Sequence, residues 1–137
     1  MDSQALGSLF LPPLQDLFRR IPRLQCAALF TVDGVNICAI GLSEQQLGKM
    51  AALSASAIAI GDASFANLRN QPEDRPAMQA LIMESEGLQI VSQRIIRPGG
   101  DLILMAAADA ALGVVLLGMR QTDQALRALF FGGTSAG

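Results

Sequence analysis

The segment of residues 47–68 restricts the possible folds of this chain more than any other part of the sequence. Its only charged residues are Lys49 and Asp62, and most of the other positions hold Ala, Ser, Leu, Ile or Gly. The preceding residues Ser43-Glu44-Gln45-Gln46 match a capping box, in which a serine and a glutamine close the start of a helix reciprocally. The sequence therefore predicts a long helix that begins after Ser43 and ends near Asn70.

One stripe of this helix is expected to pack on the core, because apolar or small residues recur along it at spacings of three and four. The stripe consists of Leu47, Met50, Ser54, Ala57, Gly61, Phe65 and Leu68. A helix that is apolar on all sides must be buried on all sides, whereas a two-layer domain of 137 residues covers only one face of a surface helix. The back of the helix, with Ala52, Ala55, Ala59 and Ala63, is therefore predicted to meet a second chain. The alternative is that an alanine-rich helix simply exposes its methyl groups to water.

The composition is consistent with a hidden apolar surface. Hydrophobic residues make up 51% of the chain and charged residues 16%, against a usual charged share of about 25%. The longest apolar stretch, residues 102–118, is interrupted by Asp109, whereas a membrane-spanning helix needs about 20 apolar residues. The N-terminal residues lack the positive charge of a secretory signal. We therefore expect a cytoplasmic protein that does not insert into a membrane.

The remaining elements predict an α+β fold with a five-stranded antiparallel sheet, in the order α-ββ-α-βββ-α, and with helices on both faces. Residues 1–10 are expected to be an N-terminal tail, residues 11–131 the folded domain and residues 132–137 a flexible C-terminal tail. Pro12 and Pro13 suit the first turn of a helix that begins at Leu11, and Asp109 is the expected N-cap of the last helix. Strands are expected over residues 24–32, 35–40, 78–85, 88–97 and 102–108.

The first two strands are predicted to form a hairpin around Asp33-Gly34, a frequent two-residue turn. Facing residues then have numbers that sum to 67, so Leu29 faces Cys38 and Cys26 faces Gly41. This register places the two thiols on opposite faces of the sheet, whereas a three-residue loop would reverse the assignment. Two reduced, half-buried cysteines are expected.

The third strand presents a free edge in this arrangement. Its residues Gln79, Ala80, Leu81, Ile82 and Met83 include neither proline nor lysine, and an apolar free edge invites aggregation. Pairing with its own copy about a two-fold axis would close the edge. The alternative is that the opening hairpin covers it within one chain. We expect self-pairing, with the residues above and the alanines of the long helix as the dimer interface.

The sequence predicts no enzyme active site. Histidine, the commonest general base and metal ligand, is missing altogether, and Cys26 and Cys38 alone cannot form a zinc site. Gly41 and Gly48-Lys49 do not have the spacing of a phosphate-binding loop. A net charge of −2, without Trp or Tyr, argues against a nucleic-acid partner. We therefore expect no catalytic residue, no cofactor and no metal.

The order of elements and three of its segments resemble the Roadblock (dynein light-chain) family. The segments are the hairpin Ala27-Ala28-Leu29-Phe30-Thr31-Val32-Asp33-Gly34-Val35, the small-residue helix over 50–68, and the closing segment over 102–120 with Ala106-Ala107-Ala108-Asp109-Ala110-Ala111-Leu112-Gly113. The resemblance covers roughly residues 11–131. It implies a sheet whose first and last helices share one face while the long helix covers the other. Bacterial members of the family are similar to regulators of the gliding-motility GTPase.

The resemblance further implies a homodimer that pairs its third strands and places its two long helices side by side. Such a chain serves as a non-enzymatic scaffold or adaptor for a Ras-like small GTPase or a motility or signalling assembly, and at most stimulates the partner GTPase. The Pro12-Pro13 entry to the first helix departs from the family pattern. Two other functions stay open from the residues alone: a small-ligand-sensing α+β domain, and a subunit of a larger hetero-assembly.

Overall fold

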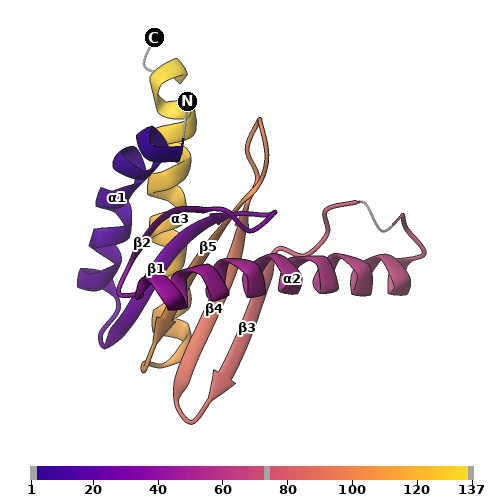
Figure 1. The fold of residues 1–137 in the computed structure, drawn as a ribbon, viewed down its shortest axis with the longest axis horizontal. Coiled ribbons are helices and arrows are strands. Elements are labelled where there is room, and N and C mark those ends of the chain that lie inside the picture. The colour runs from indigo at the N-terminus through magenta and orange to yellow at the C-terminus, as the bar shows by residue number, and fades with distance from the viewer. Residues whose placement is uncertain (1–2, 73–74, 136–137) are drawn as a thin grey trace.

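The computed structural model describes residues 3–72 and 75–135, which form a five-stranded antiparallel sheet between two helical layers (Figure 1). In chain order the elements are α1 (Ser3–Arg20), β1 (Leu24–Thr31), β2 (Asn36–Ile40), α2 (Glu44–Arg69), β3 (Ala80–Ser85), β4 (Leu88–Ile95), β5 (Leu102–Ala108) and α3 (Leu112–Ser135). The strand order is β2-β1-β5-β4-β3. Helices α1 and α3 cover one face and α2 crosses the other. The predicted fold class is confirmed.

Two hydrophobic cores lie on the two faces of the sheet, because alternate residues of each strand point to opposite sides. On the side of α1 and α3 the core contains Phe10, Leu14, Leu17, Leu29, Leu102, Leu104, Val115, Met119 and Leu126. Under α2 it contains Ala28, Phe30, Ala51, Ile58, Met78, Ile103 and Met105. Strand β5 supplies residues to both cores and is buried along its whole length.

The β1–β2 hairpin reaches the predicted register by an unexpected route. Thr31 N donates to Val35 O at 2.8 Å, so the loop has three residues instead of the predicted two. A β-bulge between Leu29 and Phe30 then shifts the pairing by one residue, and Leu29 faces Cys38 as predicted. An extra residue in one strand compensates for the extra residue in the loop. Cys26 and Cys38 consequently lie in different cores, and both are free thiols.

Helix α1 begins at Ser3, earlier than expected, so the N-terminal tail predicted for residues 1–10 is wrong for residues 3–10. Pro12 and Pro13 lie inside the helix rather than at its start. The preceding turn is stabilised by tertiary packing, which outweighs the local preference of proline for a first turn. Phe10 is fully buried and meets the ring of Phe130 edge to face, with 4.9 Å between the ring centroids.

Further boundaries differ from the expectation: β1 ends at Thr31, β2 begins at Asn36 and β4 ends at Ile95. Helix α3 begins at Leu112 and extends to Ser135, into the predicted C-terminal tail. Asp109 is not its N-cap, because the carbonyl of Ala111 accepts the first bonds of the helix, from the amides of Val114 and Val115 at 3.0 and 3.2 Å, while the Asp109 backbone pairs with Arg23. Strand β3 begins at Ala80 instead of residue 78, because the amides of Ala77 and Met78 donate to the carboxylate of Asp62 rather than to a strand.

Helix α2 has the predicted ends but a different buried face. Ser43 and Gln46 form the capping box, and Asn70 ends the helix in the left-handed conformation. Its buried residues are Ala51, Ser54, Ile58 and Ala66. Of the predicted stripe, Phe65 and Leu68 are exposed, because the end of α2 extends past the edge of the sheet (Figure 1). By length and composition α2 could also cross a membrane, but here its first half packs on the sheet.

Two glycine substitutions should have opposite effects on stability. Gly41 has φ +85°, and an added Cβ would collide with the carbonyl oxygen of Gln25, so Gly41→Ala should lower the free energy of unfolding by at least about 2 kcal/mol. Gly48 lies in α2 with open space around it, so Gly48→Ala should raise this free energy by about 0.5–1 kcal/mol. Urea unfolding of the two variants measures both changes. If both substitutions changed the free energy of unfolding by the same amount, the left-handed backbone conformation of Gly41 would be contradicted.

Candidate functional site

Strand β3 forms an open edge of the sheet. Within the described residues, β3 pairs with β4 on one side and with no strand on the other. The β1–β2 hairpin lies at the opposite end of the sheet, so the alternative that it covers β3 is wrong. Leu81 packs toward α2, whereas Ile82 pairs with Val91, whose side chain lies in the core under α3. Ile82 and Met83 are exposed.

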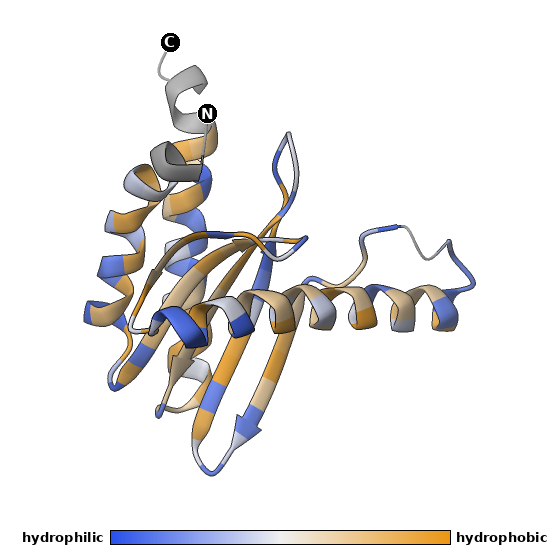
Figure 2. Ribbon diagram, viewed as in Figure 1, coloured by the Kyte–Doolittle hydropathy of each residue, from blue (hydrophilic) through white to orange (hydrophobic). Residues whose placement is uncertain are grey.

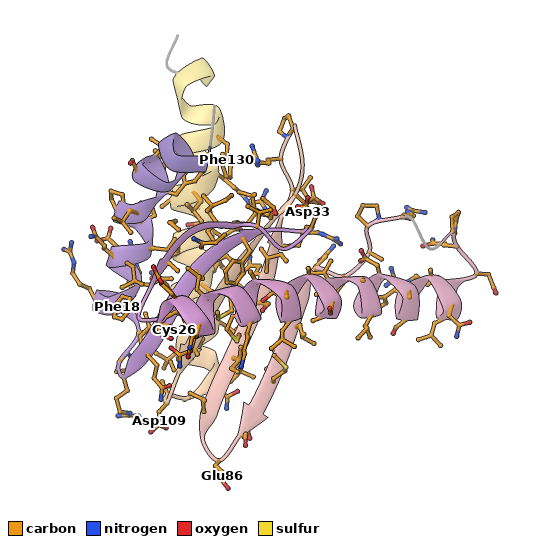
Figure 3. All side chains as sticks on the ribbon, in the orientation of Figure 1. Phe18, Cys26, Asp33, Glu86, Asp109 and Phe130 are labelled. Carbon is orange, nitrogen blue, oxygen red and sulfur yellow. The ribbon has the colours of Figure 1, made fainter. Side chains whose placement is uncertain are left out.

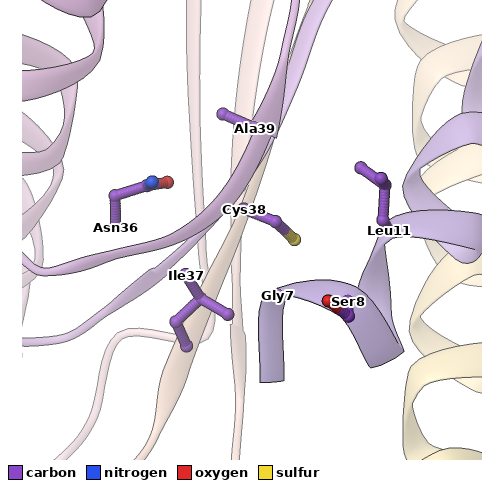
Figure 4. A pocket seen from close by; sticks show the side chains of 7 residues that line it. All are labelled: Gly7, Ser8, Leu11, Asn36, Ile37, Cys38 and Ala39. Atoms are coloured by element: carbon purple, nitrogen blue, oxygen red, sulfur yellow. The ribbon is translucent and has the colours of Figure 1, made fainter. Parts of the chain in front are cut away.

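The other edge of the sheet, β2, lies against α1. A Cβ added at Gly7 would be 2.7 Å from the carbonyl oxygen of Ile37, so this turn of α1 runs directly against the strand backbone. A shallow notch of about 420 Å³ remains between them, and Cys38 points across it toward Leu11 of α1 (Figure 4). The two edges therefore differ: β2 has a helix against it, and β3 is open.

The two cysteines are poor nucleophiles. Burial raises the pKa of the Cys38 thiol to about 11. Burial also raises the pKa of Cys26, although a hydrogen bond with the backbone of Ala107 partly opposes the effect. Both groups are therefore protonated thiols at neutral pH, and a thiol reacts far more slowly than a thiolate.

An apolar groove of about 440 Å³ adjoins the open edge. It lies between α2 and the α2-facing side of β3 and β4, and it is lined by Met50, Leu53, Ser54, Ser56, Ala57, Ile60, Leu81, Met83, Ile90 and Ser92. Leu53 is 61% exposed and Ile60 is 67% exposed. Figure 2 shows apolar residues along β3 and β4 beside the helix. The groove and the β3 edge form one continuous surface, because Leu81 and Met83 belong to both.

The structure divides the predicted interface residues between different surfaces. Leu81 and Met83 line the groove, whereas Ala55 and Ala59 line a crevice of about 460 Å³ on the other flank of α2. Ala55 is half-buried beneath the β1–β2 turn, with its Cβ 3.5 Å from a Cβ added at Gly34. On the helix itself, Ala52 is exposed and Ala63 is half-buried.

The predicted strand residues are also divided. Ala80 and Ile82 face away from α2, and Gln79 precedes the strand and lines a small pocket with Gln93 and Arg127. The helix residues beside the open edge are Met50, Leu53, Ala57 and Ile60. Met50 and Ala57 were predicted to pack on the core, and Leu53 and Ile60 were not assigned to either face. No periodic signal could have selected this flank, because α2 is apolar or small-residue on nearly all sides.

A buried ion pair lies in the crevice on the other flank of α2. Arg94 of β4 has a side chain only 6% exposed, and its Nη1 and Nη2 lie 2.9 and 3.0 Å from the two carboxylate oxygens of Asp62. Arg94 Nε lies 3.3 Å from Oδ2 of Asp101, in the loop before β5. Bidentate pairing of this kind fixes the relative orientation of the two groups.

The environment of Asp62 lowers its pKa. Burial by itself would raise this pKa, but hydrogen bonds from Arg94, Met78 and Ala77, together with the charge of Arg94, outweigh burial and lower it to about 2. Asp62 is therefore ionised at any physiological pH. Its carboxylate is a structural acceptor with four donors, an arrangement unsuited to proton transfer near neutrality.

Other polar groups that could suggest chemistry have structural roles. Glu84 accepts a hydrogen bond from Gln89 Nε2, and Glu86 lies at the tip of the β3–β4 turn, where its side chain points into solvent (Figure 3). Gly48 and Lys49 belong to the first turns of α2, after the capping box. These residues do not converge on the groove or on the crevice.

Solved structures with the same fold include bacterial Roadblock-type proteins. The gliding protein MglB from Thermus thermophilus has a TM-score of 0.74 and 19% identity, over 92% of this chain and 91% of that chain. A Roadblock/LC7 domain from Streptomyces avermitilis has a TM-score of 0.67 and 20% identity, over 84% and 92%. An MglB described as having a tetrameric arrangement has a TM-score of 0.72 and 18% identity, over 92% and 90%. No protein-family model and no curated protein matches the sequence. The chain thus has the Roadblock fold, as the sequence resemblance implied.

The ion pair of Asp62 should make stability depend on pH in a defined window. Because the folded-state pKa of about 2 lies below the usual value of 3.8, the contribution of Asp62 is complete above about pH 4 and is lost as the pH falls toward 2. The loss should be about 2 kcal/mol. Urea unfolding of the wild type and of Asp62→Asn between pH 2 and pH 6 tests this, because the other carboxylates affect both proteins. Parallel pH curves would contradict an ionised, paired Asp62.

Proposed function

We propose that this chain is a homodimeric, cytoplasmic adaptor of the Roadblock type that binds and regulates a Ras-like small GTPase, or an assembly containing one, and performs no chemistry itself. The observation that carries the proposal is the open β3 edge, which continues into the apolar groove under α2. A surface of this kind is suited to another polypeptide, because its strand offers unpaired backbone groups and its groove offers apolar contact.

A second copy of the chain fits both parts of this surface. Two β3 strands related by a two-fold axis would pair and join the two sheets. Helix α2 extends past β3 (Figure 1), so in such a pair its free end would reach over the partner's sheet. Leu53 and Ile60 would then lose contact with water. A stable interface buries about 800 Å² on each partner, roughly a tenth of the 7817 Å² accessible surface of this chain.

The fold similarity supports self-association and a role in regulation. One of the similar structures has a tetrameric arrangement and another is a gliding protein. The sequence resembles the family to which regulators of the gliding-motility GTPase belong. A regulator that acts by docking needs no reactive side chain of its own, which is consistent with the protonated cysteines and the fully paired Asp62.

A second candidate function rests on the groove alone. Its volume of about 440 Å³ lies within the range of small-molecule pockets, about 300–1,000 Å³, and its lining is mostly apolar. In that case an apolar small molecule would occupy the groove of a monomer and raise its melting temperature. The oligomeric state therefore separates the two candidates.

Leu53→Arg should separate the two protomers. Light scattering of the wild type should give twice 14.4 kDa, constant on dilution. A buried unpaired guanidinium at Leu53 should weaken the dimer at least about tenfold. Leu117→Arg is the matched control, because Leu117 is 57% exposed on α3, on the other side of the sheet. A wild-type monomer at all concentrations would contradict the dimer and favour the ligand-binding candidate.

Binding to a GTPase is a separate prediction. A Ras-like GTPase of the gliding-motility type, loaded with a non-hydrolysable GTP analogue or with GDP, is titrated with the chain and followed by fluorescence anisotropy. One nucleotide state should bind at least about tenfold more tightly than the other, since a regulator must distinguish the two states. The same titration with nucleotide alone is the control. Tight nucleotide binding by the chain itself, or equal binding to both states, would refute the regulatory role.

A further inference from the structure

We propose that Asp62 and Arg94 are positioning residues that fix α2 relative to the edge strand β3 and thereby set the geometry of the surface that a second copy would meet. The consequence for dimerisation rests on the proposed function. The coupling between helix and strand is a property of the single chain and can be measured without a dimer.

One ion pair joins α2 to β4, the neighbour of the edge strand. Arg94 belongs to β4, the strand that pairs with β3, and Asp62 belongs to the second half of α2. Both carboxylate oxygens and both terminal nitrogens of the guanidinium are engaged, at 2.9 and 3.0 Å. Such a contact fixes both the distance and the angle between the carboxylate on α2 and the guanidinium on β4, because two parallel hydrogen bonds permit little rotation.

The same two residues also hold the segment leading into β3. Asp62 Oδ1 accepts hydrogen bonds from the amides of Ala77, at 2.9 Å, and Met78, at 2.7 Å. Arg94 Nη1 donates to Met78 O at 3.0 Å, and the Arg94 amide donates to Gln79 O at 2.8 Å. The residues immediately before β3 are therefore attached to the helix through Asp62 and to β4 through Arg94.

Gly61 and Met78 make a close contact beside the ion pair. A Cβ added at Gly61 would collide with the side chain of Met78, so the segment and the helix touch where α2 has no side chain. Met78 is buried. Because Gly61 precedes Asp62, the contact and the ion pair act at one place on the helix. Together they fix how far α2 lies from the start of β3.

The rest of the α2 packing relies mainly on small residues. The buried residues of the helix are Ala51, Ser54, Ile58 and Ala66; all but Ile58 are small, and small side chains offer few steric features that would prevent a helix from sliding or rotating. A buried ion pair contributes little net stability, since desolvation offsets its Coulombic attraction. The ion pair instead fixes the orientation of α2 on the sheet, which an apolar pair of similar size would not do.

The groove depends on this orientation because its two walls lie close to the pair in the sequence. Ile60 is two residues before Asp62 on α2, and Leu81 is three residues after Met78. A change in the rotation of α2 or in the path of residues 77–79 would displace Ile60 relative to Leu81. Both residues line the groove.

The test replaces the ion pair by apolar residues in the double variant D62L/R94M. Replacement of both partners avoids a buried unpaired charge, but the urea unfolding midpoint should fall, because the amides of Ala77 and Met78 lose their acceptor. Hydrogen exchange of the amides of residues 77–83, measured at concentrations where the protein is monomeric, should accelerate at least about tenfold. The dimer dissociation constant, measured by analytical ultracentrifugation, should rise at least about tenfold. R94K, which keeps the charge without the bidentate geometry, should change both quantities in the same direction.

Asp101→Asn is the matched control, because Asp101 pairs with Arg94 Nε from the loop before β5 and belongs to neither α2 nor the segment before β3. It should leave exchange over 77–83 and the dissociation constant near the wild-type values. A folded D62L/R94M with wild-type exchange and wild-type dimer affinity would overturn the proposal. If the double variant does not fold, hydrogen exchange and dimer affinity are measured on D62N, which keeps the side-chain shape and removes the charge. Wild-type values of both in D62N would then overturn the proposal.

The same measurements distinguish a failure of this inference from a failure of the proposed function. A wild-type monomer would refute the dimer, yet faster exchange over residues 77–83 in D62L/R94M would still support the coupling. A wild-type dimer whose affinity and exchange are unchanged by D62L/R94M would refute the coupling and leave the dimer intact.

Discussion

The central strand β5 requires a sheet that is covered on both faces. All seven of its residues are buried, and they alternate between the core under α1 and α3 and the core under α2. Buried backbone groups must find partners, and β5 finds them in β1 on one side and β4 on the other. Two helical layers and at least three strands follow from this strand alone. The outer strands β2 and β3 are then left with one edge each, and only the edge of β2 lies against a helix of the same chain.

Helices cover the two faces of the sheet in different ways, and this difference explains where the many apolar residues of the sequence lie. Helices α1 and α3 bury large side chains such as Phe10, Leu14 and Met119. Helix α2 instead touches the sheet through small residues together with Leu47, Met50 and Ile58, and it leaves Leu53, Ile60 and Leu68 exposed. Large exposed apolar residues beside an open strand are costly for an isolated monomer. The same arrangement is favourable when a second polypeptide covers helix and strand together, which connects the composition to the proposed dimer.

The features that could be predicted from the sequence are those encoded locally. The capping box at Ser43 and the apolar run of β5 each identify an element through neighbouring residues. The start of α1 could not be predicted, because the part of the helix before Pro12 rests on contacts distant in sequence, of Phe10 with Phe130 and of the Gly7 turn with Ile37. The loop and the bulge of the first hairpin each shift the register by one, so the pairing of Leu29 with Cys38 was predicted correctly with the wrong loop length. The flank of α2 beside β3 was missed because nearly every position on the helix is apolar or small.

The uniform apolar character of α2 removes the information that normally orients a helix. An amphipathic helix is oriented by its own pattern, since rotation would expose apolar groups and bury polar ones. Rotation of α2 would exchange one small or apolar residue for another at little cost. Asp62 interrupts this uniformity in the second half of the helix, and its bidentate partner comes from a strand 32 residues later. The sequence shows an unusual acid in an apolar helix, and only the folded chain shows why it is there. A helix able to offer apolar surface on several sides needs one polar contact to define which side faces the sheet.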